Sequence, residues 1–305
     1  MTKLALVFPG QGSQYVGMAR DLVETYPQAR AVFEQADAAL GIALSQLCFA
    51  GPENILTDTI NAQPALLTHS IAALRVLQSL KRDETPTFVA GHSLGEYSAL
   101  VAADVMEFAD ALKLVRERGR VMKDAGEKAP GAMAAIIGMD DAALEAVCAQ
   151  AGAQTANYNS PGQIVISGST DAMERASALA KERGARRVLP LAVSIASHSR
   201  LMEPAAHEFE RAVAQTAMRA PKVPVISNVT ARPLSSVDEI KRELVAQLTS
   251  SVQWVKSIEY IIAQGTTSFV ELGPKDVLAG LIRRINKDAH AVSVGDVASV
   301  KAFVG

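Results

Sequence analysis

The stretch FVAGHSLGEYSALVAA, residues 88–103, sets a short apolar run against a Gly-X-Ser-X-Gly pentapeptide and then an alanine-rich helical pattern. A buried strand, a sharp glycine turn and a helix in this order are typical of a nucleophile elbow, which lifts a serine hydroxyl above the carboxyl end of a sheet. Gly91 and Gly95 stand where larger side chains would clash in such a turn. Ser93 is therefore the candidate nucleophile, and an unreactive serine in a glycine-rich turn is the alternative. We expect the helix to begin at Leu94, whose free N–H could then face an oxyanion at Ser93.

The sequence on both sides of this turn alternates between short apolar runs and helical patterns. Expected strands are residues 4–8, closed by the turn Pro9-Gly10-Gln11-Gly12, and 87–90; expected helices are about 16–40, 61–81, 94–103 and 107–125. After residue 193 we expect a helix near 200–218, a strand at 223–227, helices within 237–264, a strand at 268–272, a helix at 275–286 and a strand at 290–294. Such alternation predicts an α/β domain with a parallel sheet covered on both faces.

Residues 130–190 follow a different order. The segments GAMAAIIGM, DDAALEAVCAQAG, QTANYN, QIVISG, TDAMERASALAKERG and ARRVLPL predict strand, helix, strand, strand, helix and strand. This βαββαβ order is typical of a ferredoxin-like unit. We therefore predict a large catalytic domain, residues 1–127 and 193–305, interrupted by a small ferredoxin-like domain, residues 128–192. The cleft between two such domains is where a site is expected.

Composition and charge exclude several functions. Of the 305 residues, 49% are hydrophobic and 20% are charged, which is enough for a sizeable core. The net charge of −2 provides no basic field for a nucleic acid, and no apolar stretch reaches the length of a membrane span. Cys48 and Cys148 match no metal-ligand spacing, and the stretch MTKLALVFPGQG lacks a signal-peptide pattern. We expect no metal, reduced thiols and a cytoplasmic location.

A serine nucleophile needs a general base, and the five histidines are the candidates. His198 lies in the segment SIASHSRLMEP, after the small domain, where a loop could return it to the sheet. His92 abuts Ser93, but in an elbow its side chain should diverge from the nucleophile and pack. His69 and His207 lie inside helical patterns, and His290 opens a late strand.

One arginine stands out on a helical wheel of residues 107–123. Beyond the first turn, Arg118 is the only charged residue within the broad apolar arc of this helix. A planar guanidinium suits bidentate recognition of a carboxylate. The alternatives are snorkelling to the surface or an ion pair within the fold. Recognition of a ligand would imply an acyl substrate with a free acid end.

The motifs FPGQGSQ (8–14), NAQPALLT (61–68), GHSLGEYSALVAA (91–103), RERG (116–119), NYNSPGQIVISG (157–168), SHSRLMEP (197–204) and ELGPKDVLAGL (271–281) occur in this order. As a set, the chain closely resembles malonyl-CoA:acyl carrier protein transacylases. The resemblance covers nearly the whole length and implies an α/β-hydrolase-like large domain with a ferredoxin-like small one. It also implies ping-pong transfer of a malonyl group from malonyl-CoA to the phosphopantetheine thiol of the carrier protein, in fatty acid or polyketide synthesis.

The resemblance assigns roles to single residues. It implies that Ser93 attacks the thioester, that His198 is first base and then acid, and that Arg118 holds the malonate carboxylate. The remaining implied roles are the oxyanion N–H groups of Gln11 and Leu94, the main-chain carbonyl of Gln247 that orients the histidine, and the pocket residues Gln63 and His92. No cofactor is implied, and we expect a monomer. The carrier protein is acidic, so a local basic patch should exist, and Lys275, Arg283, Arg284 and Lys287 are one candidate.

Three alternatives remain open at this point. In the synthase domains that the chain resembles, a serine directly before the base goes with methylmalonyl selection, and Ser197 occupies that position here. A serine thioesterase or esterase would need an acid between Ser93 and His198, for which Asp171 is the best candidate. A carrier-protein-binding scaffold with a decayed site is the non-enzymatic alternative.

Overall fold

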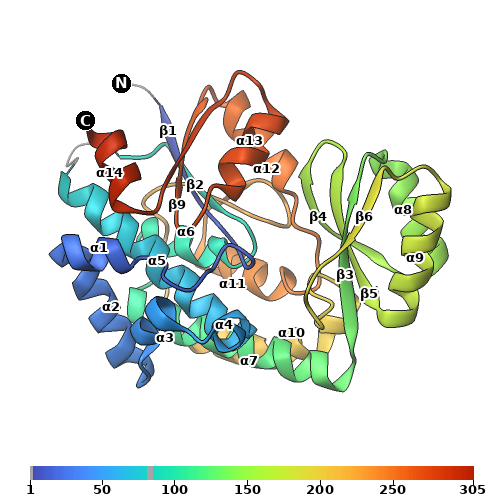
Figure 1. Ribbon diagram of the computed structural model, residues 1–305, viewed down its shortest axis with the longest axis horizontal. Helices are drawn as coiled ribbons and strands as arrows, with labels where there is room; N and C mark the ends of the chain where they lie inside the picture. Colours follow the sequence, from blue (N-terminus) through green and yellow to red (C-terminus); the bar gives the residue numbers. More distant parts are fainter. Residues whose placement is uncertain (1–2, 81–84) are drawn as a thin grey trace.

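The computed structural model describes residues 3–80 and 85–305, and it contains two sheets, with the long helix α7 (Phe108–Lys128) leading toward the second of them (Figure 1). The larger sheet has six strands in the order β10-β9-β1-β2-β7-β8. Its strands are β1 (Leu4–Phe8), β2 (Phe88–Gly91), β7 (Val225–Ile226), β8 (Pro233–Leu234), β9 (Ser268–Leu272) and β10 (His290–Val294). All neighbours run parallel except β8, which pairs antiparallel with β7 at one edge.

Both faces of the large sheet are covered, which explains why its strands are short and apolar. Alternate residues of one strand enter different cores: Leu6 and Phe8 pack into the larger cluster, and Ala5 and Val7 into the other. The helices packed on this sheet or on one another are α1 (Arg20–Thr25), α2 (Pro27–Leu40), α3 (Leu44–Ala50), α4 (Glu53–Thr57), α5 (Thr59–Leu80), α6 (Gly95–Ala102), α7 (Phe108–Lys128), α10 (Glu203–Gln215), α11 (Val237–Ala246), α12 (Trp254–Ala263), α13 (Val277–Ile285) and α14 (Val297–Val304).

The second sheet lies to one side of the first, at the right of Figure 1. It is antiparallel, with the order β4-β5-β3-β6. Its elements in chain order are β3 (Gly131–Ile137), α8 (Asp141–Ala151), β4 (Gln154–Ser160), β5 (Gln163–Ser169), α9 (Thr170–Glu182) and β6 (Arg187–Pro190). The predicted βαββαβ order and the fold class are therefore confirmed. The boundaries at 127/128 and 192/193 stay a prediction.

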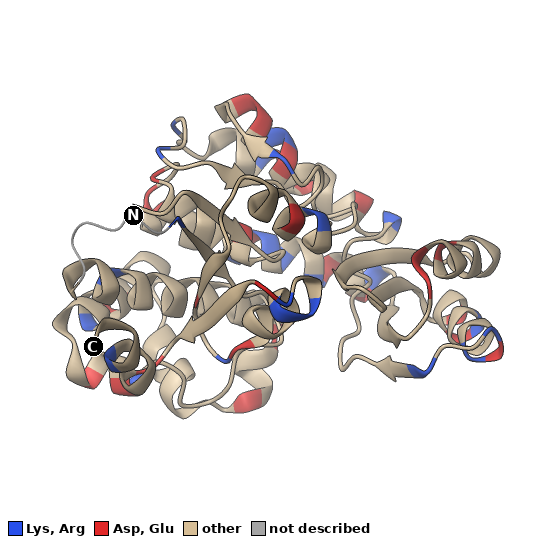
Figure 2. Cartoon of the chain, turned by 90° about the horizontal axis from the view of Figure 1, so that it is seen from above, with Lys and Arg blue, Asp and Glu red and all other residues tan. Residues whose placement is uncertain are grey.

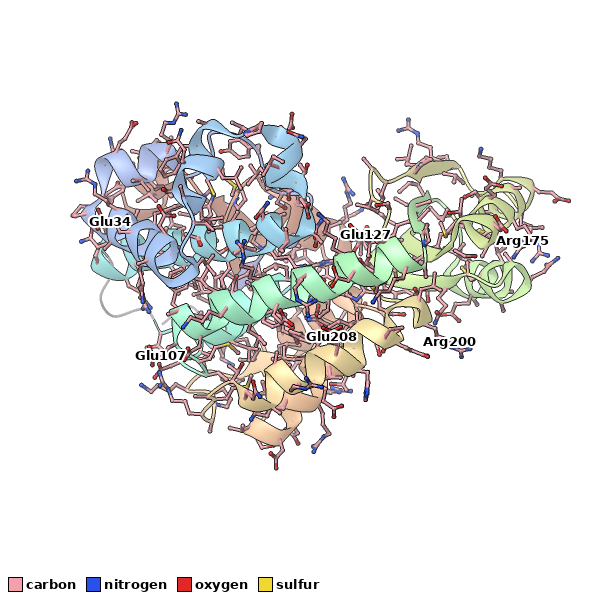
Figure 3. The ribbon with its side chains drawn as sticks, turned by 90° about the horizontal axis from the view of Figure 1, so that it is seen from below. Glu34, Glu107, Glu127, Arg175, Arg200 and Glu208 are labelled. Carbon is pink, nitrogen blue, oxygen red and sulfur yellow. The ribbon has the colours of Figure 1, made fainter. Side chains whose placement is uncertain are left out.

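Two features tie the sheets together. Figure 3 shows α7 running along the underside from Glu107 to Glu127, with Glu208 of α10 beside it. Arg120 of α7 bonds Glu208 at 2.5 Å, and both side chains are partly exposed, so the pair contributes little stability. On another side of the molecule Asn157 of β4 forms a parallel bridge with Val252, near α12.

Some predicted elements were wrong in their bounds. The helix expected at 16–40 is two helices, because Tyr26, which precedes Pro27, is extended. The first of them begins only at Arg20, after Gly17 with a φ of 102° and Ala19 with a φ of 61°. The strand expected at 223–227 contains only Val225 and Ile226. The helix expected near 200–218 is a 3-10 turn, Arg200–Met202, followed by α10, which ends at Gln215. The elements α3, α4, β8 and α14 were not predicted, and the expected end of one helix at residue 81 lies outside the described residues.

Candidate active site

The predicted elbow is present at the carboxyl end of β2, which lies between β1 and β7 in the large sheet. The backbone of Ser93 is left-handed, with φ 51°, a conformation that costs roughly 1–3 kcal/mol in a non-glycine residue. A Cβ on Gly91 would lie 1.9 Å from the backbone of Gly95, and one on Gly95 would lie 2.0 Å from the carbonyl oxygen of Phe8. Only glycines fit at these positions, so the turn can hold Ser93 above the sheet.

Asn228 clamps this strained turn, a contact that the sequence analysis missed. Its Oδ1 accepts from the Ser93 N–H at 2.7 Å, and its Nδ2 donates to the Gly91 carbonyl at 2.7 Å. Asn228 follows β7, the neighbour of β2 in the parallel sheet, so both lie at the same edge. The sequence did contain a signal for this role, because Asn228 is a polar residue directly after the strand expected at 223–227.

His198 lies beside the serine. Its Nε2 is 2.9 Å from Ser93 Oγ, and its Nδ1 lies 2.8 Å from the main-chain carbonyl of Gln247 and 3.1 Å from that of Ser250. Because carbonyls only accept, Nδ1 carries the proton, which leaves Nε2 free to accept from the hydroxyl. Like Ser93, His198 is left-handed, with φ 59°. Within residues 3–80 and 85–305 no carboxylate bonds this imidazole, and Asp171 is exposed on α9, so the triad considered for a hydrolase is not assembled.

The environment keeps the imidazole neutral. Burial and then the charge of Arg118 lower the pKa of His198 to about 3, against the hydrogen bonds to two carbonyls, which favour its charged form. The side chain can therefore accept a proton over the whole neutral range. Protonated imidazole would be a strong acid here, so the proton that it takes is readily passed on.

Arg118 lies on the buried face of α7, only 1% exposed. Its Nη1 donates to Gln63 Oε1 at 2.9 Å, and its Nη2 donates to Gln247 Oε1 at 2.8 Å and to Ser93 Oγ at 3.1 Å. The guanidinium also lies 5.5 Å from the centre of the Tyr97 ring. Among the described residues it forms no ion pair, and its Nε has no acceptor. Arg118 is therefore a buried cation with an unused donor, and it is hydrogen-bonded to the candidate nucleophile. Such a group suits an anionic ligand.

Of the two expected oxyanion donors, Leu94 directly follows the serine, and Gln11 lies in the turn after β1, the parallel neighbour of β2. No hydrogen bond between described residues uses the main-chain N–H of Gln11 or of Leu94, and α6 begins one residue after Leu94. The Gln11 side chain accepts from Thr59 Oγ1 at 3.0 Å, and Gln63 Nε2 donates to the same hydroxyl at 2.8 Å. The turn that carries Gln11 is thus linked through two side chains to Arg118.

The other histidines lie apart from the hydroxyl. The His92 ring packs against the Trp254 ring at a tilt of 59°, with centroids 5.6 Å apart, and its Nε2 is 2.8 Å from Asn159 Oδ1. Its side chain thus points toward β4 rather than at Ser93, as expected for an elbow. His69 is fully buried in α5, where its Nε2 lies 2.7 Å from the Gly295 carbonyl; His207 and His290 are exposed.

Three further features concern charge, membrane spans and metal ligands. Figure 2 shows acidic and basic residues intermixed along the chain. Within residues 3–80 and 85–305 no helix is both long and apolar enough to cross a bilayer, and no group of three or more metal-ligating side chains comes together.

Comparison with known proteins gives one consistent result. Residues 5–301 match the family model described as an acyl transferase domain. The chain is 47% identical to the malonyl CoA-acyl carrier protein transacylase of Bacillus subtilis, over 100% of this chain and 97% of that protein, and 47% identical to that of Escherichia coli K12, over 99% of each.

Solved structures agree. An acyl carrier protein S-malonyltransferase from Vibrio cholerae superposes with a TM-score of 0.96 at 47% identity, covering 99% of this chain and all of the other. A malonyl-transacylase in complex with its type II PKS acyl-carrier protein superposes with a TM-score of 0.97 at 42% identity, covering 99% of each chain.

Proposed function

The chain belongs to the acyl transferase family that contains the malonyl-CoA–acyl carrier protein transacylases, and from this premise we propose that it transfers a malonyl group from malonyl-CoA to the phosphopantetheine thiol of an acyl carrier protein. One observation carries the proposal. A single hydroxyl, Ser93 Oγ, lies 2.9 Å from His198 Nε2 and 3.1 Å from Arg118 Nη2. A nucleophile, its base and a carboxylate-binding group are therefore within one short acyl length.

In the first half-reaction the Ser93 hydroxyl passes its proton to His198 Nε2 as Oγ attacks the thioester carbonyl. The negative oxygen of the tetrahedral intermediate is stabilised by the N–H groups of Gln11 and Leu94. The carbon–sulfur bond then breaks, His198 returns the proton to the departing sulfur of coenzyme A, and malonyl-serine remains. The second half-reaction reverses these steps with the carrier thiol as nucleophile, which is a ping-pong mechanism.

Arg118 selects the acyl group. Its fork suits the two oxygens of the malonate carboxylate, which would replace the serine hydroxyl as an acceptor of Nη2. Gln63 and Gln247 hold the guanidinium from two sides through their side-chain oxygens. The main-chain carbonyl of Gln247 also keeps His198 in the required tautomer, in the place of a triad acid. We expect no metal or redox cofactor, because each step uses only hydroxyl, imidazole and thiol chemistry.

The carrier protein is proposed to dock along α13, from Lys275 before the helix to Arg283 and Arg284 in its last turn. Lys275 Nζ donates to the Gly12 carbonyl at 3.1 Å, and Arg284 Nη1 donates to Gln163 Oε1 of β5 at 2.7 Å. The basic patch thus borders both the turn that carries Gln11 and the second sheet. Together with the exposed Arg283 and Lys287, these charges favour an acidic partner.

Intact-protein mass spectrometry tests the chemistry. Exposure to malonyl-CoA should add one malonyl group to the wild-type protein and none to Ser93→Ala. The matched control is Ser98→Ala, because Ser98 is a buried α6 serine whose hydroxyl has no partner. Parallel exposures to methylmalonyl-CoA and acetyl-CoA define the acyl preference. An adduct on Ser93→Ala, or equal labelling by all three thioesters, would contradict the proposal.

Charge reversal tests the docking surface. Lys275→Glu with Arg284→Glu should lower kcat/KM for the carrier protein about tenfold or more while leaving acylation by malonyl-CoA unchanged. Arg75→Glu is the control, because Arg75 is exposed on α5 twelve residues beyond Gln63, roughly 18 Å along the helix. Equal effects of the two substitutions would place the carrier elsewhere.

A further inference from the structure

Two glutamates are buried directly behind the site, and the proposed reaction uses neither. Glu96 of α6 is 0% exposed and Glu243 of α11 is 5% exposed. Neither forms an ion pair among the described residues. An ionised carboxylate in the interior is costly unless hydrogen bonds and a nearby cation compensate for lost solvation. Their contacts therefore require an explanation.

Donors surround both carboxyl groups. Glu96 Oε1 accepts from the Asn228 N–H at 3.0 Å, and its Oε2 accepts from Gln247 Nε2. Glu243 Oε1 accepts from the Val229 N–H at 2.9 Å, and its Oε2 accepts from Ser227 Oγ at 2.7 Å. These contacts join α6, the segment after β7 and α11 into one buried network.

The two carboxyl groups lie beside each other, because they accept from the consecutive main-chain N–H groups of Asn228 and Val229. A hydrogen bond between two carboxyl groups requires a proton on one of them, since two carboxylates can only accept. Burial, followed by the charge of Glu243, raises the pKa of Glu96, and burial raises the pKa of Glu243. Two carboxyl groups in one desolvated site cannot both ionise near neutral pH.

Gln247 connects this pair to the substrate-binding group. Its Nε2 donates to Glu96 Oε2 and to the Ser93 carbonyl, and its Oε1 accepts from Arg118 Nη2 at 2.8 Å. An amide that turns its NH₂ toward a carboxylate must present its oxygen on the other side. Glu96 therefore decides which atom of Gln247 faces the guanidinium.

We propose that Glu96 and Glu243 share one proton, and that the single negative charge they keep fixes the Gln247 amide and so positions Arg118 for the acyl carboxylate. Glu96 is thus a positioning residue that acts through Gln247. The role in acyl selection rests on the proposed function, whereas the shared proton does not.

The charges around the pair differ on its two sides. Toward the site, the Glu96 end is near the cation of Arg118 and the phenol of Tyr97. On the other side, Glu243 borders a hollow of about 460 Å³ whose charged lining residues are Arg232, Glu239 and Arg242. The cation of Arg118 favours the negative charge at the Glu96 end, against the charge of Glu243, which raises the pKa of Glu96. The hollow beside Glu243 gives the proton a route to solvent that does not pass the serine.

The isosteric pair Glu96→Gln and Glu243→Gln provides the test. Glu243→Gln keeps a donor toward Glu96 and leaves the single charge in place. Glu96→Gln removes that charge and sets an NH₂ against either the Asn228 N–H or the Gln247 NH₂. If Gln247 turns over to relieve the clash, its NH₂ faces Arg118, and carboxylate recognition is lost.

We expect Glu96→Gln to lower kcat/KM for malonyl-CoA about 10²-fold and to lower acylation by acetyl-CoA less than about threefold. Glu243→Gln should stay within about threefold of wild type for both thioesters. A general weakening of the fold would lower both rates together, so the ratio of the two rates isolates the positioning role. Equal losses on both thioesters, or Glu243→Gln behaving like Glu96→Gln, would overturn the proposal.

Infrared spectroscopy gives a second readout that needs no activity. The wild-type protein at neutral pH should show the carbonyl stretch of a protonated buried carboxylic acid, and this band should be missing from Glu243→Gln. Buried Glu271, whose pKa is raised to about 7, adds its own band to both spectra and cancels in their difference. An empty difference spectrum would refute the shared proton even if Glu96→Gln does not fold. Absence of malonyl transfer by the wild-type protein would instead refute the proposed function.

Discussion

Replacing Arg118 by methionine should move the pH dependence of acylation, because the guanidinium charge holds down the pKa of the base. Arg118 Nη2 and His198 Nε2 both bond Ser93 Oγ, at 3.1 and 2.9 Å. The two nitrogens are therefore at most about 6 Å apart, at which a unit charge contributes roughly 3 kcal/mol at an effective dielectric constant of about 20, or about 2 pH units.

The sign follows from the protonation state that the reaction needs. His198 must be neutral to accept the serine proton, and its pKa of about 3 keeps it so at all higher pH values. Removal of the cation raises that pKa, so the acid limb of the rate profile should rise from near pH 3 to about pH 5. Methionine fills the apolar arc of α7, so the substitution need not open a cavity.

Acylation by acetyl-CoA isolates the effect of the Arg118 charge on the pKa of His198, because the acetyl group has no carboxylate for Arg118 to bind. The rate is measured by intact mass in single-turnover experiments between pH 3 and 8. Arg118→Lys is the control. It keeps a positive charge but not the planar fork, so its acid limb should stay near that of the wild type while malonyl transfer falls. Superimposable acid limbs for Arg118→Met and wild type would refute the electrostatic reasoning.

Three further predictions concern the residues around the hydroxyl. His198→Ala should reduce acylation by malonyl-CoA about 10²-fold or more, whereas His207→Ala on the exposed face of α10 should not, as single-turnover rates would reveal. Asn228→Ala leaves a buried N–H and a carbonyl of the turn without partners, so the free energy of unfolding should fall by roughly 2–3 kcal/mol and kcat should fall as well. Thermal melting measures the loss of stability, and an unchanged melting temperature would contradict the role of Asn228 as a clamp. Gly95→Ala should not yield folded protein, whereas Gly280→Ala, whose added Cβ would meet nothing within 4 Å, should be neutral or stabilising by up to about 1 kcal/mol; soluble expression and melting curves distinguish the two.

The parts of the fold that the sequence predicts are those set by local physics. The elbow can be predicted because a Cβ at position 91 or 95 would lie about 2 Å from backbone atoms, so only glycine fits at Gly91 and Gly95. Arg118 is readable because a helix of period 3.6 places it among apolar residues. The break before Pro27 was also a local signal, since Tyr26 could not stay helical, and the prediction of one long helix overlooked it.

The network behind the site could not be read in the same way. Glu96 follows the elbow glycine and looks like an ordinary acidic residue in the first turn of a helix, where it favours the helix dipole. Glu96 contacts Asn228, 132 positions later in the chain, and Gln247, 151 positions later. Its burial and these contacts depend on how α11 and the segment after β7 pack against α6. Asn228 is hidden for the same reason, because its partners precede it by more than 130 residues.

The carbonyl partners of His198 have a consequence for how the proposed reaction is balanced electrostatically. In a triad, a carboxylate stabilises the imidazolium that forms when the serine loses its proton. Here two neutral carbonyls take that place, and the nearest charge is the cation of Arg118, which opposes protonation. A carboxylate bound to Arg118 would cancel much of that opposition within a few ångströms of the ring. The acyl group that the guanidinium selects would therefore also raise the pKa of the base, so a substrate lacking the carboxylate would lose both its anchor and part of its base catalysis.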